Sequence, residues 1–313
     1  MVDSKHKWKA WLYLSPALVL LAIFTVYPII NTIRLAFLED YGMMKAISGA
    51  TFEFGFGNFE KVVEYRNFLT CLKNTVLLCV ITVPISTILA LLIAVILNSI
   101  GPLRRVLQTI YFLPYVTNSI AIGMVFAAMF NIVGNVAAEN SRIISAGIIN
   151  NFLGLFGVEP INWINAGSSY WANMTVMIIY IVWNALPFKI LILLGALQSV
   201  NKQYYDAAKV DGTSKFRTLT KITIPLLSPM IAYVVITGFM GGFKEYSSIV
   251  GIFGEKMGPP GNRGAMQTMV GFIYDSLSTN NQGRASAAAL ILFAIIMLVT
   301  LINLQVSKKK VHY

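Results

Sequence analysis

Long apolar runs separated by short polar segments make up almost the whole chain. Six of these runs are long enough to form membrane-spanning helices, because an α-helix needs about 20 residues to cross the hydrocarbon core of a bilayer. Their approximate limits are 11–37, 71–98, 108–132, 170–197, 226–252 and 285–306. The pattern predicts an all-α fold, a bundle of about six transmembrane helices in one domain that comprises residues 1–313.

The composition supports this fold class and explains the basic charge. Of the 313 residues, 57% are hydrophobic and only 12% are charged, which is unlike a soluble domain. A net charge of +11 is compatible with a nucleic-acid partner, but the basic residues gather at the ends of the apolar runs. Thirteen of the 24 Lys and Arg residues fall in the two chain ends and in the segments after the second and fourth runs. The positive-inside rule predicts that both termini are cytoplasmic, so we expect a membrane partner and no nucleic acid.

The cysteines and histidines give no indication of a metal site or a nucleophile. Cys71 and Cys79 lie eight residues apart on one predicted helix, which separates them by about 12 Å, too far for a disulfide. We expect both to be packing residues. His6 and His312 lie in the two terminal tails, so no cluster of metal ligands and no Ser/His/Asp constellation is expected.

The polar segment at about 200–225, between the fourth and fifth runs, is the most distinctive part of the chain. Asp206–Val210 is predicted to form a short helix that ends where Gly212 can leave the right-handed helical conformation. Thr213 or Ser214 is predicted to cap a second helix. The pattern predicts a helix-turn-helix that lies at the membrane surface.

This segment resembles the EAA loop of bacterial ATP-binding-cassette importer permeases, whose pattern is E-A-A-x3-G-x9-I-x-L-P. The chain reads Asp206-Ala207-Ala208, three residues, Gly212, nine residues, Ile222, one residue and Ile224-Pro225, with Asp for Glu and Ile for Leu. The resemblance implies a coupling helix that seats in a cleft of a separate ATPase, and Pro225 is expected to end the insert. The coupling residues that it implies are Asp206, Ala207, Ala208, Asp211, Gly212, Thr213, Ile222 and Pro225. The alternative is a solvated loop of high helix propensity.

We expect the chain to have no nucleotide site of its own. The dipeptide Gly-Lys never occurs, so the phosphate-binding loop G-x-x-x-x-G-K-[ST] is absent. If ATP hydrolysis drives transport, ATP and Mg are bound by a partner chain. The expectation is therefore a transport subunit that is not an enzyme and binds no cofactor itself.

The solute path is expected where polar groups interrupt the apolar runs, because burying such groups in lipid is costly. Three such places occur, near Pro114, near Pro187 and at the glycines that precede Lys244. Their aromatic, hydroxyl, amide and acid groups suit a sugar, whose ring stacks on aromatics and whose hydroxyls need hydrogen-bond partners. The candidate path residues are Tyr115, Ser119, Trp183, Asn184, Phe188, Gly238, Gly242, Lys244 and Glu245.

Several of these residues have an alternative, structural role. Trp183 and Phe188 would then face lipid or pack within the bundle. Lys244 and Glu245 would form a structural ion pair near the outer interface. Tyr115 and Ser119, which lie four apart on one helical face, would make hydrogen bonds between helices.

Nearly the whole chain is similar to permeases of the maltose-transporter type. At positions that contact sugar in that relative, Tyr115 and Ser119 are identical here. The other matched positions have different side chains, and they are Asn184, Ala185, Phe188, Gly238, Gly242 and Glu245. The resemblance implies a related cavity that takes a different saccharide.

The resemblance also implies a function and a set of partners. The chain would be a permease subunit of an ATP-driven carbohydrate importer in a bacterial plasma membrane. Its implied partners are a second permease chain in a heterodimer, two ATPase subunits and an extracytoplasmic solute-binding protein. A glycerol-phosphate-like polyol remains an alternative cargo.

Two other classes of protein remain open. An ion-gradient-driven secondary carrier would use Lys189, Lys244 and Glu245 as ion-coupled groups, but it leaves the 200–225 segment unexplained and shows no inverted repeat. A membrane-embedded transferase would need paired acids or a metal site. Asp206 and Asp211 are its only candidate pair.

Overall fold

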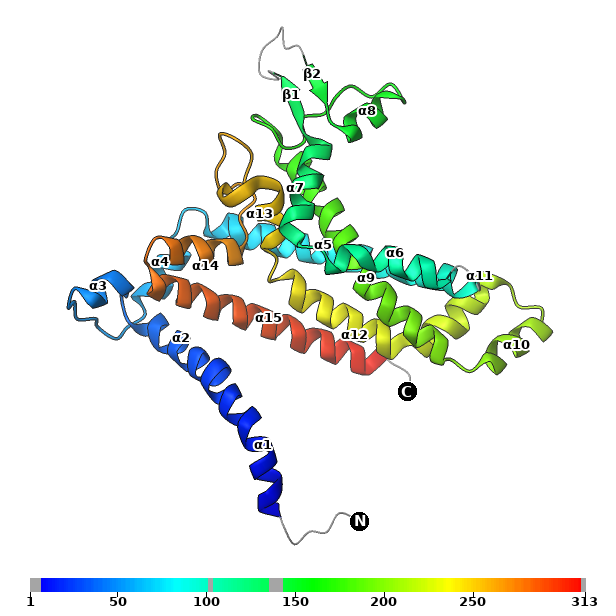
Figure 1. Ribbon diagram of the computed structural model, residues 1–313, viewed down its shortest axis with the longest axis horizontal. Helices are drawn as coiled ribbons and strands as arrows, with labels where there is room; N and C mark the ends of the chain where they lie inside the picture. Colours follow the sequence, from blue (N-terminus) through cyan, green and yellow to red (C-terminus); the bar gives the residue numbers. More distant parts are fainter. Residues whose placement is uncertain (1–6, 101–103, 135–142, 311–313) are drawn as a thin grey trace. The chain divides into compact units, whose positions relative to one another are not determined.

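A computed structural model describes residues 7–100, 104–134 and 143–310. His6 and His312 lie outside the described residues. Within these ranges the chain is mostly helical (Figure 1), which confirms the all-α fold class. An antiparallel two-stranded ribbon is the exception in the described part, and the sequence reading did not predict it.

The chain divides into two compact units. The N-terminal unit comprises Met1–Phe68 together with Phe272–Phe293. The central unit comprises Leu69–Gly271 together with Ala294–Tyr313. The single domain expected for residues 1–313 stays a prediction.

The elements follow one another along the chain as labelled in Figure 1. The first elements, all in the N-terminal unit, are α1 (Lys7–Leu21), the π turn η2 (Ala22–Val26), α2 (Tyr27–Phe37), α3 (Met43–Ile47) and α4 (Gly57–Val63). The next are α5 (Phe68–Ser99), α6 (Arg104–Val116), α7 (Ser119–Phe130), β1 (Ile132–Gly134), β2 (Ile143–Ala146), α8 (Ile148–Gly154) and α9 (Tyr170–Ser199). They are followed by α10 (Lys202–Val210), α11 (Lys215–Thr218), the π turn η3 (Leu219–Thr223), α12 (Ile224–Gly242), α13 (Ser247–Phe253) and the 3-10 turn η4 (Gly254–Lys256). The last are α14 (Met269–Ser278) and α15 (Gln282–Lys310).

Five helical segments of the described chain are long and apolar enough to cross a membrane. They are Trp8–Phe37, Phe68–Ser99, Tyr170–Ser199, Lys215–Gly242 and Gln282–Lys308. Each contains most of one of the six predicted spans, so the chain is a multi-pass membrane protein. The predicted span at 108–132 is the one without a matching long helix.

That span is divided into two shorter helices, α6 and α7. Helix α6 continues through Pro114 and ends at Val116, two residues after the proline near which the sequence predicts an interruption. The Asn118 side chain then caps α7, because its Oδ1 accepts the backbone N–H groups of Ile120 at 2.9 Å and Ala121 at 3.3 Å. With 13 and 12 residues, neither helix alone has the length of a membrane span.

The span at 226–252 begins and ends earlier than the sequence predicts. Its helix is continuous from Lys215 to Gly242, so Pro225 does not end the polar insert. The π turn η3 ends at Thr223, and Pro225 occupies the first turn of α12, where a proline needs no N–H donor. After Gly242 the chain turns and forms the separate helix α13.

Polar contacts join the end of α2 to α4 in the N-terminal unit. The Asn58 Nδ2 group donates to the carbonyl oxygens of Ala36 at 3.1 Å and Leu38 at 2.7 Å. Its Oδ1 accepts the Asp40 N–H at 3.2 Å. A hydrogen bond and ion pair from Lys61 hold the pKa of the Asp40 carboxyl below its usual value. Because both side chains of this pair are about half exposed, we expect it to contribute little to stability.

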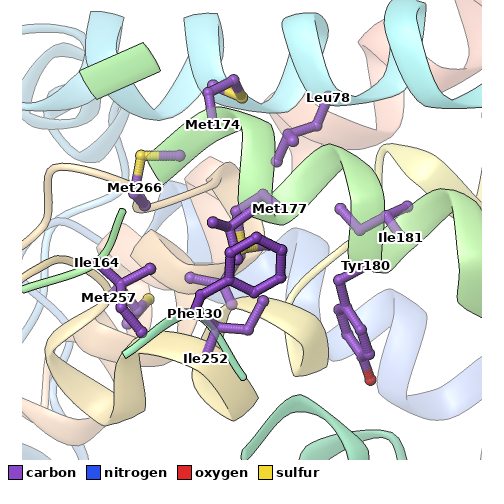
Figure 2. Close-up of a cluster of buried hydrophobic side chains, with 12 residues drawn as sticks. Leu78, Phe130, Ile164, Met174, Met177, Tyr180, Ile181, Ile252, Met257 and Met266 are labelled. Carbon is purple, nitrogen blue, oxygen red and sulfur yellow. The ribbon is translucent and has the colours of Figure 1, made fainter. Parts of the chain in front are cut away.

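A cluster of buried apolar side chains forms the core of the central unit (Figure 2). Its members come from α5, α7, α9, α13 and the loops on either side of these helices. The labelled side chains in Figure 2 are Leu78, Phe130, Ile164, Met174, Met177, Tyr180, Ile181, Ile252, Met257 and Met266. Cys71 and Cys79 are both buried and are not joined by a disulfide, as expected from their spacing.

Helices α7 and α13 cross with their backbones in contact. A Cβ atom at Gly123 would lie 2.7 Å from the Cα of Gly251, and a Cβ atom at Gly251 would lie 2.9 Å from the Cα of Gly123. No side chain separates the two helices at this point, so both positions require glycine. The crossing fixes α13 against the apolar core.

Candidate functional site

A cavity of about 300 Å³ lies within the central unit, among its membrane-spanning helices. Its walls come from α5, α6, α9 and α12 and from the turn that follows α12. The lining residues are Thr82, Val83, Ser86, Tyr115, Ile181, Asn184, Ala185, Phe188, Lys189, Val234, Thr237, Gly238, Gly241, Gly242 and Glu245. Six of the nine candidate path residues therefore line one cavity: Tyr115, Asn184, Phe188, Gly238, Gly242 and Glu245.

Two aromatic rings form one wall of this cavity. The rings of Tyr115 on α6 and Phe188 on α9 are stacked, with centroids 5.8 Å apart and planes inclined by 17°. The Asn184 amide lies one helical turn before Phe188 and donates to the Ser119 hydroxyl at 3.4 Å. An aromatic surface beside an amide and a carboxylate can bind the apolar face and the hydroxyls of a small polar solute.

The α12 glycines allow this helix to approach α5 closely. A Cβ atom at Gly242 would lie 2.8 Å from the Cys79 sulfur, and one at Gly238 would lie 3.0 Å from a Val83 methyl group. Gly238 and Gly242 are four residues apart and thus share one face of α12. These two candidates line the cavity because they bring the α12 backbone to its wall.

Three candidate path residues lie outside the cavity lining. The Ser119 carbonyl oxygen accepts a hydrogen bond from the Tyr180 hydroxyl at 2.5 Å, so Ser119 joins α7 to α9. Trp183 packs against the Phe126 ring at 5.1 Å, on the edge of the apolar core. Lys244 is exposed and has no ion pair with Glu245 in the described chain.

The cavity also has polar lining residues that the candidate set does not include: Thr82, Ser86, Lys189 and Thr237. Thr82 and Ser86 lie on α5, a helix that the sequence reading treated as a plain membrane span. They lie four residues apart, on one face of the helix, with Pro84 between them. Two hydroxyl residues on one face beside a proline are the sequence signal that could have indicated a polar face here. Lys189 belongs to the polar place near Pro187 and is a candidate ion-coupled group of the alternative carrier, but the candidate path set does not include it.

The polar segment between α9 and α12 folds as two helices joined at a glycine. Helix α10 begins at Lys202 rather than at the expected Asp206, because the Asn201 side chain caps it by accepting the Gln203 N–H at 3.0 Å. Ser214, not Thr213, caps α11 through the Arg217 N–H at 3.4 Å. Both helices lie at the end of α9 and the start of α12 (Figure 1).

Gly212 gives the turn its shape. Its φ angle is +64°, a left-handed conformation that glycine adopts without the steric cost of a Cβ atom. Two hydrogen bonds close the end of α10, from the Gly212 N–H to the Lys209 carbonyl at 3.1 Å and from the Thr213 N–H to the Ala208 carbonyl at 2.9 Å. These are the two bonds of a Schellman motif, which confirms the expected helix end.

The candidate coupling residues differ in exposure. Asp206 is exposed and pairs with Lys209 at 3.1 Å, while Ala207, Asp211 and Gly212 are also exposed. The remaining candidates are buried or half-buried, and they are Ala208, Thr213, Ile222 and Pro225. The same segment exposes two large apolar side chains, Val210 at 88% and Phe216 at 76%. It thus presents a mixed polar and apolar surface suited to contact with another protein.

No group of three or more His, Cys, Asp or Glu residues capable of holding a metal ion occurs in the part of the chain that the structure describes. The structure instead combines membrane-spanning helices, a polar cavity among them and an exposed pair of helices at one end. This arrangement defines a membrane transport subunit.

The chain belongs to the family described as binding-protein-dependent transport system inner membrane component, whose pattern it matches over residues 75–312. It is 31% identical to the lactose transport system permease protein LacF of Rhizobium radiobacter, over 94% of this chain and 91% of that protein. It is 29% identical to the arabinooligosaccharides transport system permease protein AraP of Halalkalibacterium halodurans, over 97% and 89% of the two chains.

The fold is that of solved importer permeases. A chain of a bacterial ABC transporter involved in the import of the acidic polysaccharide alginate matches 97% of this chain over 96% of its own length, with a TM-score of 0.77 and 20% identity. The protein is thus a permease subunit of the ATP-binding-cassette importer class, and it acts in transport rather than as an enzyme.

Proposed function

We propose that this permease forms half of the pathway of a bacterial carbohydrate importer driven by a separate ATPase. The observation that carries the proposal is the cavity among the membrane helices, with the stacked rings of Tyr115 and Phe188 beside polar groups. A sugar ring can lie against the aromatic wall, while Asn184 and Glu245 can bind its hydroxyls. The names of LacF and AraP, which refer to lactose and arabino-oligosaccharides, support a saccharide cargo.

The coupling role of the 206–225 segment is part of the same proposal. Its basic residues indicate that it lies on the cytoplasmic side with both chain termini. There its exposed face, with Asp206, Val210 and Phe216, would seat in a cleft of an ATPase subunit that holds ATP and Mg. A solute-binding protein would deliver the sugar from outside, and a second permease chain would complete the pathway.

The experiment is uptake by proteoliposomes that contain the complete importer, prepared with ATP inside or without it. Labelled lactose and a labelled arabino-oligosaccharide serve as the solutes. We expect uptake of at least one of them that requires ATP and the binding protein. Uptake that continues without ATP and follows a proton or sodium gradient would instead identify a secondary carrier.

Replacing Tyr115 with Ala is expected to weaken sugar transport with little effect on folding, because the ring is half exposed at the cavity wall. Loss of one stacking surface corresponds to about 0.5–1.5 kcal/mol, so the KM for uptake should rise roughly two- to twelvefold. Initial uptake rates over a range of sugar concentrations measure this change. Tyr111→Ala, one turn earlier on α6 and outside the cavity lining, is the matched control and should leave KM unchanged.

A further inference from the structure

Lys189 is a charged side chain buried among the membrane-spanning helices. It lies on α9, is only 5% exposed and lines the cavity. Its Nζ lies 2.7 Å from the Ser86 hydroxyl, 3.0 Å from the Thr87 hydroxyl and 3.2 Å from the Val83 carbonyl oxygen. One turn of α5 therefore surrounds the amino group.

The hydrogen bonds around Lys189 fit a protonated amino group. The Ser86 hydroxyl donates to the Thr82 carbonyl at 2.5 Å, and the Thr87 hydroxyl donates to the Val83 carbonyl at 2.7 Å. With their hydrogens directed to these carbonyls, both hydroxyls accept from Lys189. Three acceptors around Nζ need three N–H donors, which an ammonium has and a neutral amine does not.

This positive charge has no carboxylate partner among the described residues. Glu245 lines the same cavity but forms no ion pair with Lys189, and its Oε1 accepts the Ser248 N–H at 3.2 Å. Gly238 leaves space for the ammonium, since a Cβ atom there would lie 3.3 Å from Nζ. The α5 and α9 wall of the cavity therefore carries a fixed positive charge.

We propose that Lys189 is a specificity-determining residue that selects solutes by charge, so that the cavity admits neutral and acidic saccharides and excludes cationic ones. The inference rests on the proposed function, because it requires the cavity to be part of the solute path. A fixed charge acts strongly on a solute in a narrow cavity with apolar walls, where water screens it poorly. Fixed positive charge excludes cations from other membrane pathways in the same way.

The test compares how fast an anionic and a cationic thiol reagent react inside the cavity, so it does not require the solute to be identified. Both native cysteines are replaced by Ala, and Ala185→Cys places one thiol in the cavity, one turn before Lys189. In the complete importer, this thiol reacts with the anionic sulfonatoethyl or the cationic trimethylammonioethyl methanethiosulfonate. Each rate is divided by the rate with a free thiol in solution.

With Lys189 present, we expect the normalised rate of the anionic reagent to exceed that of the cationic reagent by about tenfold or more. The reason is that Lys189 places a unit positive charge one helical turn from the thiol at position 185. Lys189→Met should remove most of this preference, and Lys189→Arg should keep it. Lys244→Met, which removes an exposed lysine outside the cavity lining, should change nothing. Equal normalised rates in the presence of Lys189, or the same preference after Lys189→Met, would overturn the inference.

The experiment separates this inference from the proposed function. If neither reagent reaches the thiol at position 185 in any state of the transport cycle, the cavity is not a water-accessible path and the proposed function itself fails. If both reagents react without charge preference, the path stands and only the role of Lys189 is refuted. Glu245→Gln provides a second check, because removing this carboxylate from the cavity lining should increase the preference for the anionic reagent further.

Discussion

Replacing Gly212 with Pro will leave the protein in the membrane but reduce ATP-driven uptake by more than tenfold. Proline fixes φ near −65°, whereas the turn requires +64°, and it removes the N–H that donates to Lys209. Such a backbone mismatch costs about 3 kcal/mol or more, enough to reorganise the turn between α10 and α11. Membrane content, uptake and ATP hydrolysis by the complete importer measure the effect.

The matched control for this prediction is Gly212→Asn. Asparagine adopts left-handed backbone angles more readily than most residues and keeps the N–H donor, so uptake should remain within about twofold of the unmodified protein. Gly212→Pro with normal uptake would remove the basis for a coupling role of this segment. Loss of uptake together with loss of the protein from the membrane would show a folding defect instead.

Gly251→Val is expected to destabilise the central unit strongly. The new side chain has no space, because even a Cβ atom would lie 2.9 Å from the Cα of Gly123 and 3.0 Å from the Ile120 carbonyl oxygen. These neighbours are backbone atoms of α7, which cannot move aside as a flexible side chain can. Overpacking of this kind costs about 3 kcal/mol or more, and thermal unfolding of the purified protein in detergent should show a clear fall in Tm.

Gly195→Ala is the control for the Gly251 prediction. Gly195 lies in α9, and a Cβ atom there meets nothing within 4 Å. Alanine should stabilise that helix by about 0.5–1 kcal/mol, because it loses less conformational freedom on folding. A Tm for Gly251→Val as high as for Gly195→Ala would mean that α7 and α13 do not pack backbone to backbone.

The long apolar runs predicted most of the fold, because a chain that crosses a bilayer must satisfy its backbone hydrogen bonds internally and a helix long enough to span the core does so. They predicted five helices well, but they did not place Pro225 within the helix that starts at Lys215. A π turn before the proline makes that continuation possible, and no simple sequence signal marks such a turn. The division of the third span similarly depends on the cap that Asn118 provides, not on the nearby proline.

The sequence also predicted part of the candidate site, because polar side chains are uncommon in membrane-spanning runs. Tyr115, Asn184 and Phe188 were found because polar and aromatic residues near prolines stand out in an apolar run. Thr82 and Ser86 were missed because single hydroxyl residues in a membrane helix usually bond to their own backbone, as Ser86 does here. Lys189 approaches from another helix and donates to the Ser86 hydroxyl, a contact that no pattern within α5 indicates.

The unbroken helix from Lys215 to Gly242 has a mechanical consequence. At 1.5 Å per residue, its 28 residues make a rod about 40 Å long, with α11 at one end and Gly238 and Gly242 near the other. A rod of that length converts each degree of tilt into a displacement of about 0.7 Å between its ends. If the proposed coupling holds, a displacement of a few ångströms at α11 would reach the space beside Gly238 through this one continuous helix.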